Sequence, residues 1–188
     1  MLQFYFGPGS SSMAPHIALR EVGAPFEPRP VSFARRETHE PWFLALNPEG
    51  KVPVLVIDGR VLTEVAGILW YVAKRYPTAQ LLPADEAWAV SWMSFLAATV
   101  HPAWQRGTEA ARSTWTIAEQ RLGGAEWALG RYSIVDIHLF RLFWRFSGRV
   151  GLDAQAYPRL AAHYERMMAR EAVKRTIAAE AAIGYELT

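Results

Sequence analysis

Cysteine is absent from the 188 residues of the chain. Without a thiol the protein has no disulfide, no thiolate metal site, no dithiol redox pair and no cysteine nucleophile. Redox enzymes that work through their own thiols are therefore excluded.

Long apolar runs and a basic leader are also missing. No uninterrupted apolar stretch approaches the roughly 20 residues that cross a bilayer, so we expect no membrane span. Met1 to Phe6 lack the basic start and long apolar run of a signal peptide, and we expect a cytoplasmic protein. The formal net charge is only +2, and no basic run is present to follow a phosphate backbone. Nucleic acid is therefore not an expected partner.

What the chain does contain is ample sequence for a packed core, since 51% of its residues are hydrophobic and 20% are charged. Through residues 1–77, apolar runs alternate with turn residues and predict the order β-α-β-α-β-β-α. Asp58-Gly59 marks a hairpin, because this pair supplies the positive φ angles of a tight turn. The other predicted elements are a strand over Leu2 to Phe6, a helix capped by Ser12, a strand over Phe26 to Phe33, a helical turn over Pro41 to Leu46 and a helix capped by Thr63.

The pattern changes after Pro77, beyond which nearly every periodic segment is helical. We therefore predict an α/β domain over residues 1–77, a linker over 78–85 and an all-helical domain over 86–188. Ser133 and Asp136 form an S-x-x-D capping box at the start of one of these helices. The predicted helices are Glu86 to about Gly107, Ala110 to Gly123, Ile134 to Ser147, Pro158 to Arg170 and Val173 to Ala182.

Three segments carry more specific motifs: Pro8 to Glu21, Asn47 to Leu55 with the following Leu62 to Glu64, and Ser133 to Asp136. In this order, and spanning nearly the whole chain, they resemble cytosolic glutathione transferases, particularly the bacterial beta-type members. The resemblance implies a thioredoxin-like N-terminal domain followed by an all-helical one. It also implies glutathione as co-substrate, a small hydrophobic electrophile as second substrate, a homodimer and no metal.

Val52-Pro53 and Glu64-Val65 are the predicted glutathione-binding segments. A bond before proline is the kind that becomes cis at modest cost, and a cis bond would leave the Val52 N–H and C=O free for a peptide ligand. Alternatively, Pro53 starts an edge strand in trans. Glu64 at a helix start can simply stabilise the helix dipole. The resemblance instead implies that Glu64 binds the ligand's α-ammonium group and that the Val65 N–H binds its α-carboxylate.

The predicted sulfur-activating residue is Ser11. Matching Pro8-Gly9 to the family's Pro-Gly pair places Ser11 where beta-type members carry cysteine, and its hydroxyl can donate a hydrogen bond to a thiolate. A shift of one residue would exchange it for Ser10 or Ser12. Tyr5 is a further alternative, although a core position in the strand suits it better.

Three further residues complete the predicted site. His101 resembles the beta-type histidine that faces the sulfur, where it would hydrogen-bond the thiol or accept its proton. The alternative is a helix-end histidine stabilised by the dipole. Arg36, or Arg35 in its place, corresponds to a lysine that reaches the glycyl carboxylate of glutathione. Trp104 is expected to wall an apolar pocket for the electrophile.

The leading functional prediction is a glutathione transferase that activates the thiol of glutathione for attack on an electrophile. One alternative is a glutathione-dependent disulfide reductase or cis-trans isomerase, because the triple serine resembles the loop of maleylacetoacetate isomerases. Another is a non-catalytic binding or interaction module that keeps the fold.

Overall fold

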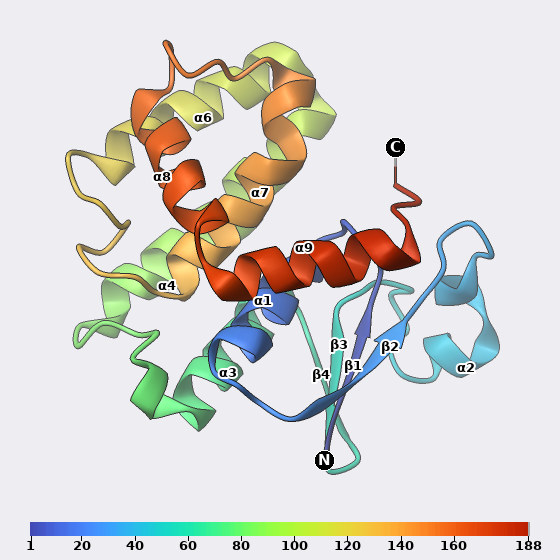
Figure 1. Cartoon of the computed structure of the whole chain (residues 1–188). Coiled ribbons are helices and arrows are strands. Elements are labelled where there is room, and N and C mark those ends of the chain that lie inside the picture. The colour runs from blue at the N-terminus through green and yellow to red at the C-terminus, as the bar shows by residue number, and fades with distance from the viewer. Residues whose placement is uncertain (188) are drawn as a thin grey trace. The chain divides into compact units, whose positions relative to one another are not determined.

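The computed structural model of the chain describes residues 1–187 (Figure 1). Residue contacts divide it into two compact units. The first combines residues 1–79 with the C-terminal segment that begins at Glu171, and the second runs from Gln80 to Arg170. Within residues 1–187 no helix is both long and apolar enough to cross a membrane.

The elements of residues 1–79 confirm the predicted thioredoxin-like order. They are β1 (Leu2–Phe6), α1 (Met13–Glu21), β2 (Phe26–Pro30), α2 (Pro41–Leu44), β3 (Val54–Ile57), β4 (Arg60–Thr63) and α3 (Val65–Arg75). The strands form one sheet in the order β2-β1-β3-β4. β1 is parallel to β2 and antiparallel to β3, and β3 is antiparallel to β4.

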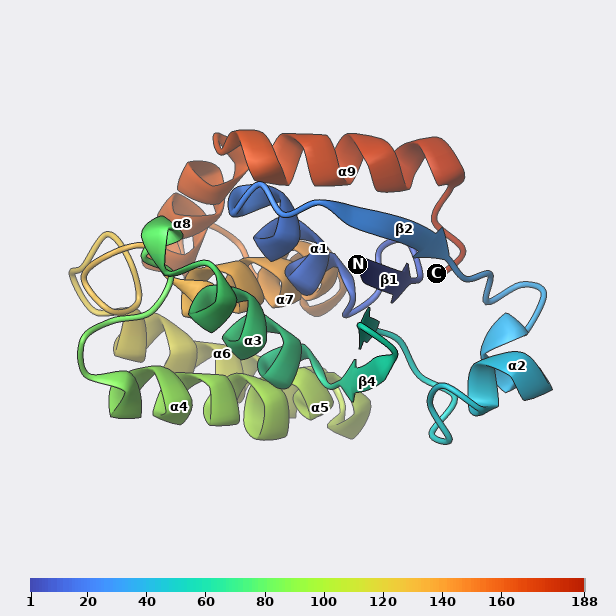
Figure 2. The same cartoon turned by 90° about the horizontal axis from the view of Figure 1, so that it is seen from below.

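Alternate residues of β1 face two different layers. Phe4 and Phe6 are buried beside His16 of α1, with ring centroids 5.6 and 4.8 Å from the imidazole. Tyr5 points to the other face and packs against Phe43 of α2. α1 and α2 therefore cover opposite faces of the sheet, and α3 packs beside α1 (Figure 2).

Two local predictions, the hairpin turn at Asp58-Gly59 and the helix cap at Thr63, had different outcomes. Asp58 and Gly59 have φ angles of 48° and 83°, which confirms the tight hairpin turn. The prediction that Thr63 caps the next helix is wrong, because Thr63 is the last residue of β4. Glu64 is the residue that precedes α3, and it has a φ of 69° and makes no side-chain cap. β4 therefore includes Thr63, which the cap prediction had placed outside the strand.

The C-terminal helix, α9 (Glu171–Ile183), packs against α1 as part of the first unit (Figures 1 and 2). The predicted helical domain of residues 86–188 therefore extends too far, because α9 buries its apolar face on the α/β unit. The boundary between the units, after Ala79, falls inside the predicted linker of residues 78–85.

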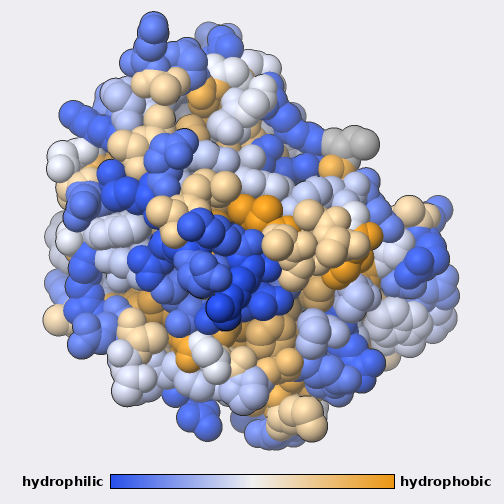
Figure 3. Space-filling model, in the orientation of Figure 1, coloured by the Kyte–Doolittle hydropathy of each residue, from blue (hydrophilic) through white to orange (hydrophobic). Residues whose placement is uncertain are grey.

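The outer face of α9 changes character along its length (Figure 3). Lys174 and Arg175 are exposed in its first half, whereas Ala181 to Ile183 expose apolar side chains at its end. Its inner face is buried and includes Thr176 and Glu180, both fully shielded from solvent. A carboxylate on the buried face of an amphipathic helix requires a specific partner.

The second unit consists of helices, as predicted. Its α-helices are α4 (Glu86–Phe95), α5 (His101–Ala103), α6 (Thr108–Leu122), α7 (Ile134–Val150) and α8 (Pro158–Met168). The single helix predicted from Glu86 to about Gly107 instead changes its hydrogen-bond pattern. It passes through a π-helical segment, Leu96–Val100, before α5 and ends in a 3₁₀ turn. Pro102 accounts for the change, because it lacks an N–H and its ring crowds the preceding turn.

The predicted capping box begins α7. The Ser133 hydroxyl accepts a hydrogen bond from the Val135 N–H at 3.2 Å, and the Asp136 carboxylate accepts one from the Ser133 N–H at 2.9 Å. These reciprocal bonds satisfy donors that the helix leaves unpaired at its start.

Candidate functional site

Four segments of the first unit leave the sheet at the same end. Phe6 lies opposite Pro30 in the parallel β1–β2 pair. In the antiparallel pairs Tyr5 lies opposite Val54, and Val54 lies opposite Thr63. The ends of β1, β2 and β4 and the start of β3 are therefore neighbours. The segments directly next to these positions are Gly7–Ser12 (the serine loop), Val52-Pro53 and Glu64-Val65, and Arg35-Arg36 lie further along the loop that follows β2.

Three adjacent serines of this loop have different roles. Ser10 and Ser12 are buried, and their hydroxyl oxygens are 2.6 Å apart. The Ser12 hydroxyl also contacts the Gly7 N–H and C=O at 3.1 Å each, so it does not cap α1 as predicted. The half-buried Ser11 instead donates to the Val52 carbonyl at 3.2 Å. Ser11 is the serine whose hydroxyl meets another segment of the candidate site.

The bond between Val52 and Pro53 is cis, one of the two forms that the sequence allowed. The Val52 carbonyl accepts the Ser11 hydroxyl, whereas the Val52 N–H has no hydrogen-bond partner within residues 1–187. Asn47 holds the preceding residue, because its Nδ2 donates to the Lys51 carbonyl at 2.7 Å. The Val52 N–H is therefore available to an extended ligand.

Glu64 and Val65 lie where β4 passes into α3. The Glu64 side chain is exposed, and Val65 is the first residue of α3, so its N–H has no acceptor within the helix. The pKa of Lys51 is raised, chiefly by its hydrogen bond to Glu49 and in smaller part by the charge of Glu64. An acidic side chain and a helix N–H that has no hydrogen-bond partner within residues 1–187 thus belong to adjacent residues, which suits an amino acid ligand.

The alternatives Arg35, Arg36 and Tyr5 differ in what they contact. Arg35 is paired with Glu37 through N···O contacts of 2.9 Å. Arg36 is exposed and in the left-handed region, with a φ of 55°, and its side chain forms no ion pair within residues 1–187. The Tyr5 ring lies 6.2 Å from that of Trp42, in the layer formed with α2. These contacts favour Arg36 over Arg35 as a ligand-binding cation and a core position for Tyr5.

His101 and Trp104 belong to the second unit, where they flank the same aromatic ring. The Phe146 ring centroid is 6.0 Å from that of His101 and 5.7 Å from that of Trp104, which stacks on it. Burial and then the charge of Arg141 lower the pKa of His101 to about 4. A neutral imidazole of this kind can share a hydrogen bond, but it holds an abstracted proton poorly at neutral pH. Of the two predicted roles, hydrogen bonding is therefore the one that its environment suits.

The second unit also contains a cavity of about 490 Å³. Neither His101 nor Trp104 lines it, so the predicted pocket wall at Trp104 is not part of this cavity. Its lining residues are Pro83, Asp85, Trp88, Trp92, Arg121, Ala128 and Leu129. Within residues 1–187, no group of three or more histidine or acidic side chains is placed to hold a metal ion.

His138 makes the stability of the protein depend on pH. Burial, followed by the charges of Arg141 and His101, lowers the pKa of His138 to about 3. Because this pKa is lower than in the unfolded chain, the unfolded chain binds a proton more readily. The contribution of His138 to stability is therefore complete above about pH 6.5 and is lost as the pH falls towards the folded pKa. His138→Leu should remove roughly 2 kcal/mol of the stability loss between pH 7 and pH 5. Urea unfolding at both pH values tests this, with the exposed His39→Leu as control; equal losses in wild type and His138→Leu would contradict it.

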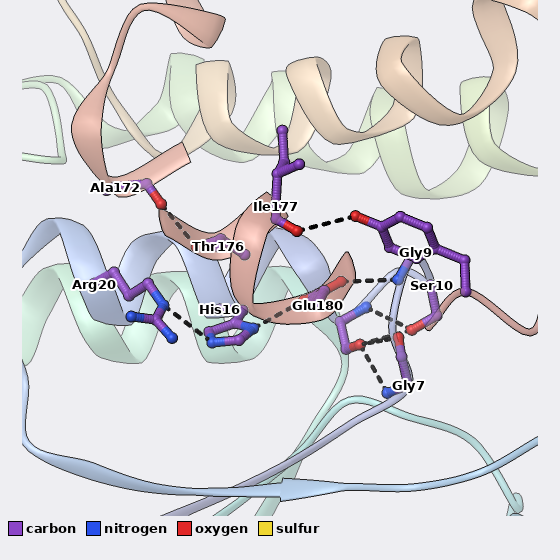
Figure 4. A network of polar contacts seen from close by, with 11 residues as sticks. Gly7, Gly9, Ser10, His16, Arg20, Ala172, Thr176, Ile177 and Glu180 are labelled. Carbon is purple, nitrogen blue, oxygen red and sulfur yellow. Dashed lines mark hydrogen bonds and ion pairs between the residues drawn. The ribbon is translucent and has the colours of Figure 1, made fainter. Parts of the chain in front are cut away.

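Sequence reasoning missed a buried polar network in the first unit (Figure 4). Glu180 of α9 bonds to the Gly9 N–H in the serine loop and to His16 of α1, each at 2.8 Å. His16 and Glu180 are almost completely buried. The signal that could have revealed the network is the position of Glu180, because helical periodicity places it on the same face as Val173 and Thr176.

Comparison with known proteins identifies the family. Residues 10–75 match the family model described as glutathione S-transferase, N-terminal domain. The chain is 31% identical to glutathione S-transferase GST-4.5 of Xanthomonas campestris pv. campestris over 95% of this chain and 98% of that protein. A solved sphingomonad glutathione S-transferase complexed with glutathione is 34% identical, with a TM-score of 0.86 over 95% of this chain and 98% of that one. The beta class enzyme of Sphingomonas chungbukensis is 36% identical, with a TM-score of 0.83 and the same coverage.

The fold and these likenesses define a two-part protein with a thioredoxin-like unit and a helical unit. The chain belongs to the glutathione S-transferase family. Its predicted similarity to bacterial beta-type members is confirmed by the beta class structure. The predicted fold class is confirmed by the TM-score of 0.86 to the sphingomonad structure.

Proposed function

We propose that the protein is a glutathione transferase that binds glutathione at the edge of its first unit and activates the thiol for attack on a small hydrophobic electrophile. The observation that carries the proposal is the contact of 3.2 Å between the Ser11 hydroxyl and the Val52 carbonyl. This contact joins the candidate sulfur-activating residue to the backbone that would pair with the ligand. The solved sphingomonad relative complexed with glutathione supports the ligand assignment.

The residues of the first unit suit the separate parts of glutathione. The Val52 backbone would pair with the cysteinyl backbone of the ligand as an added strand does. Glu64 would accept the α-ammonium group, and the Val65 N–H would donate to the α-carboxylate. Arg36 would reach the glycyl carboxylate. Each role matches a chemical group of the ligand to a group of opposite charge or hydrogen-bonding sense.

In the reaction glutathione supplies the nucleophilic sulfur. An unperturbed thiol has a pKa of about 8.5 and is mostly protonated at neutral pH, so its thiolate must be stabilised. In the free protein the single hydroxyl proton of Ser11 is donated to the Val52 carbonyl. When the ligand backbone pairs with Val52, the hydroxyl would turn and donate to the sulfur, once the thiol proton has passed to solvent. The sulfur then bonds to the electrophilic carbon, and the leaving group departs with its electron pair.

The second unit and the assembly complete the proposal. By the family resemblance, His101 would share a hydrogen bond with the thiol, and Trp104 would offer an apolar surface to the electrophile. We place the protein in the cytoplasm as a homodimer, as the family resemblance implies. A monomeric mass in light scattering would contradict the dimer.

Titration calorimetry with glutathione tests the proposed function and the role of Glu64. Wild-type protein should bind glutathione, and Glu64→Gln should weaken binding about tenfold because a charge-assisted hydrogen bond to the α-ammonium group is lost. Glu49→Gln is the matched control, since Glu49 is an exposed acid of the same unit that pairs with Lys51 at 3.0 Å. Absence of wild-type binding at millimolar glutathione would exclude the proposed function. Equal losses in the two variants would remove Glu64 from the binding site.

A further inference from the structure

Glu180 is a buried acid that touches the serine loop from outside it. It lies 171 positions from Gly9 in the sequence, and its Oε2 accepts a hydrogen bond from the Gly9 N–H at 2.8 Å (Figure 4). Its side chain has no exposed surface, so water does not share this contact. A buried carboxylate is retained only where several donors satisfy it.

The second donor to Glu180 is identified by the chemistry of its neighbours. His16 Nδ1 is 2.8 Å from Glu180 Oε1, and His16 Nε2 is 3.2 Å from the Arg20 Nε–H. A guanidinium group only donates, so Nε2 must be the accepting nitrogen of the ring. His16 therefore carries its proton on Nδ1 and donates it to Glu180. The carboxylate thus receives one hydrogen bond from α1 and one from the serine loop.

The backbone at Gly9 is closely covered by the residues that follow α9. Its φ of 73° lies in the left-handed region, and a Cβ atom added there would come within 2.9 Å of the Tyr185 ring. The Tyr185 hydroxyl in turn donates to the Ile177 carbonyl of α9 at 3.2 Å. α9 therefore holds Gly9 through the hydrogen bond from Glu180, and the Tyr185 ring leaves no room for a side chain at this position.

Ser11 follows Gly9 by two residues, so whatever fixes Gly9 also limits where the Ser11 hydroxyl points. The Ser11 hydroxyl meets the Val52 carbonyl on the side where the ligand would bind. A hydrogen bond to a thiolate depends steeply on distance and direction, and a displacement of about 1 Å at a reacting group can cost about 100-fold in rate.

We propose that Glu180 is a positioning residue for thiol activation: by holding the Gly9 N–H, it sets the serine loop so that the Ser11 hydroxyl is aimed at the sulfur of glutathione. The inference rests on the proposed function, because it assigns Glu180 a role through Ser11. Glu180 itself touches neither the sulfur nor the electrophile in this scheme. Glu180 thereby links α9 to the position of the serine loop.

Glu180→Gln is the decisive variant. Gly9 and His16 both present N–H groups to this side chain, whereas an amide has only one oxygen and places an NH₂ group against the second donor. Thr176→Val is the matched control, because Thr176 is equally buried on the same helix and its hydroxyl bonds to the Ala172 carbonyl within α9 at 2.8 Å. The control removes a buried polar group without touching the serine loop.

Two measurements separate positioning from simple stabilisation. In the glutathione-free protein, amide hydrogen exchange of Gly9 should be slow in wild type, at least about tenfold faster in Glu180→Gln, and unchanged in Thr176→Val. In the glutathione complex, ultraviolet titration of the thiolate should show a thiol pKa about one unit higher in Glu180→Gln alone. The kcat at pH 7 should fall about tenfold while KM for glutathione changes less than twofold.

Each outcome bears on the proposal. An exposed, fast-exchanging Gly9 amide in wild type would overturn it, as would an unchanged thiol pKa in Glu180→Gln or the same shift in Thr176→Val. If Glu180→Gln does not fold, Glu180→Asp keeps the charge but shortens the side chain, and the same shifts in smaller measure are expected. A wild-type complex whose thiol titrates like free glutathione would instead refute thiol activation itself. The exchange measurement would still decide whether Glu180 holds the loop.

Discussion

Asp136→Ala is expected to lower the free energy of unfolding by about 4 kcal/mol, well beyond the loss of a helix cap. Asp136 is fully buried in the second unit. Besides its two bonds to Ser133, of 2.9 and 3.0 Å, it accepts the Ala128 N–H at 2.8 Å and contacts His163 Nε2 at 3.1 Å. Its removal leaves several buried donors without an acceptor, and each unsatisfied group costs about 1–3 kcal/mol.

Asp153→Ala is the matched control for this prediction. Asp153 also accepts two backbone N–H groups, those of Gln155 and Ala156, at 2.9 and 2.8 Å. Because Asp153 is exposed, water replaces it in the variant, and the expected loss is below about 1 kcal/mol. The melting temperature should fall by roughly 10 °C for Asp136→Ala and only slightly for Asp153→Ala. Similar shifts in the two variants would show that burial of Asp136 adds nothing to its cap.

The parts of the fold that follow from local chemistry were predictable from the sequence. Asp58-Gly59 defines its hairpin because the turn needs positive φ angles, and the capping box of Ser133 and Asp136 defines the start of α7. The place of α9 was not predictable in this way. Periodicity indicates which face of a helix is buried, but it does not say which distant segment buries it. Gly9 and Glu180 meet only once the chain is folded.

The same distinction between local sequence signals and folded contacts applies to the candidate site. Sequence motifs placed Ser11, Val52 and Glu64 in segments that the sheet register brings to one end, because short paired strands fix where their ends lie. The three adjacent serines could not be ranked by residue type, since all have the same hydroxyl. Their ranking depends on the bonds within the loop, which occupy Ser10 and Ser12 with each other.

Ser11→Ala is expected to have the largest effect on the proposed reaction. If Ser11 donates to the thiolate, its loss should raise the thiol pKa of bound glutathione by about one unit or more. Removing one donor from a developing or bound anion commonly costs about 100-fold in rate, and we expect a loss of kcat at pH 7 between tenfold and that value. The affinity for glutathione should change little, because the protonated thiol gains little from the hydroxyl. Ultraviolet thiolate titration and steady-state kinetics measure the two effects.

The pH dependence of the Ser11→Ala defect distinguishes thiol activation from other roles of the hydroxyl. A raised thiol pKa lowers the thiolate fraction most below the wild-type pKa and not at all well above the variant's pKa. The rate difference should therefore be largest near neutral pH and shrink as the pH rises past about 9. A defect that is constant over this range would mean that Ser11 acts by orienting the ligand.

Ser10→Ala, in contrast, removes a buried contact of 2.6 Å and should lower stability while the thiol pKa stays near the wild-type value. If Ser10→Ala raised the thiol pKa and Ser11→Ala did not, the activating hydroxyl would be that of Ser10.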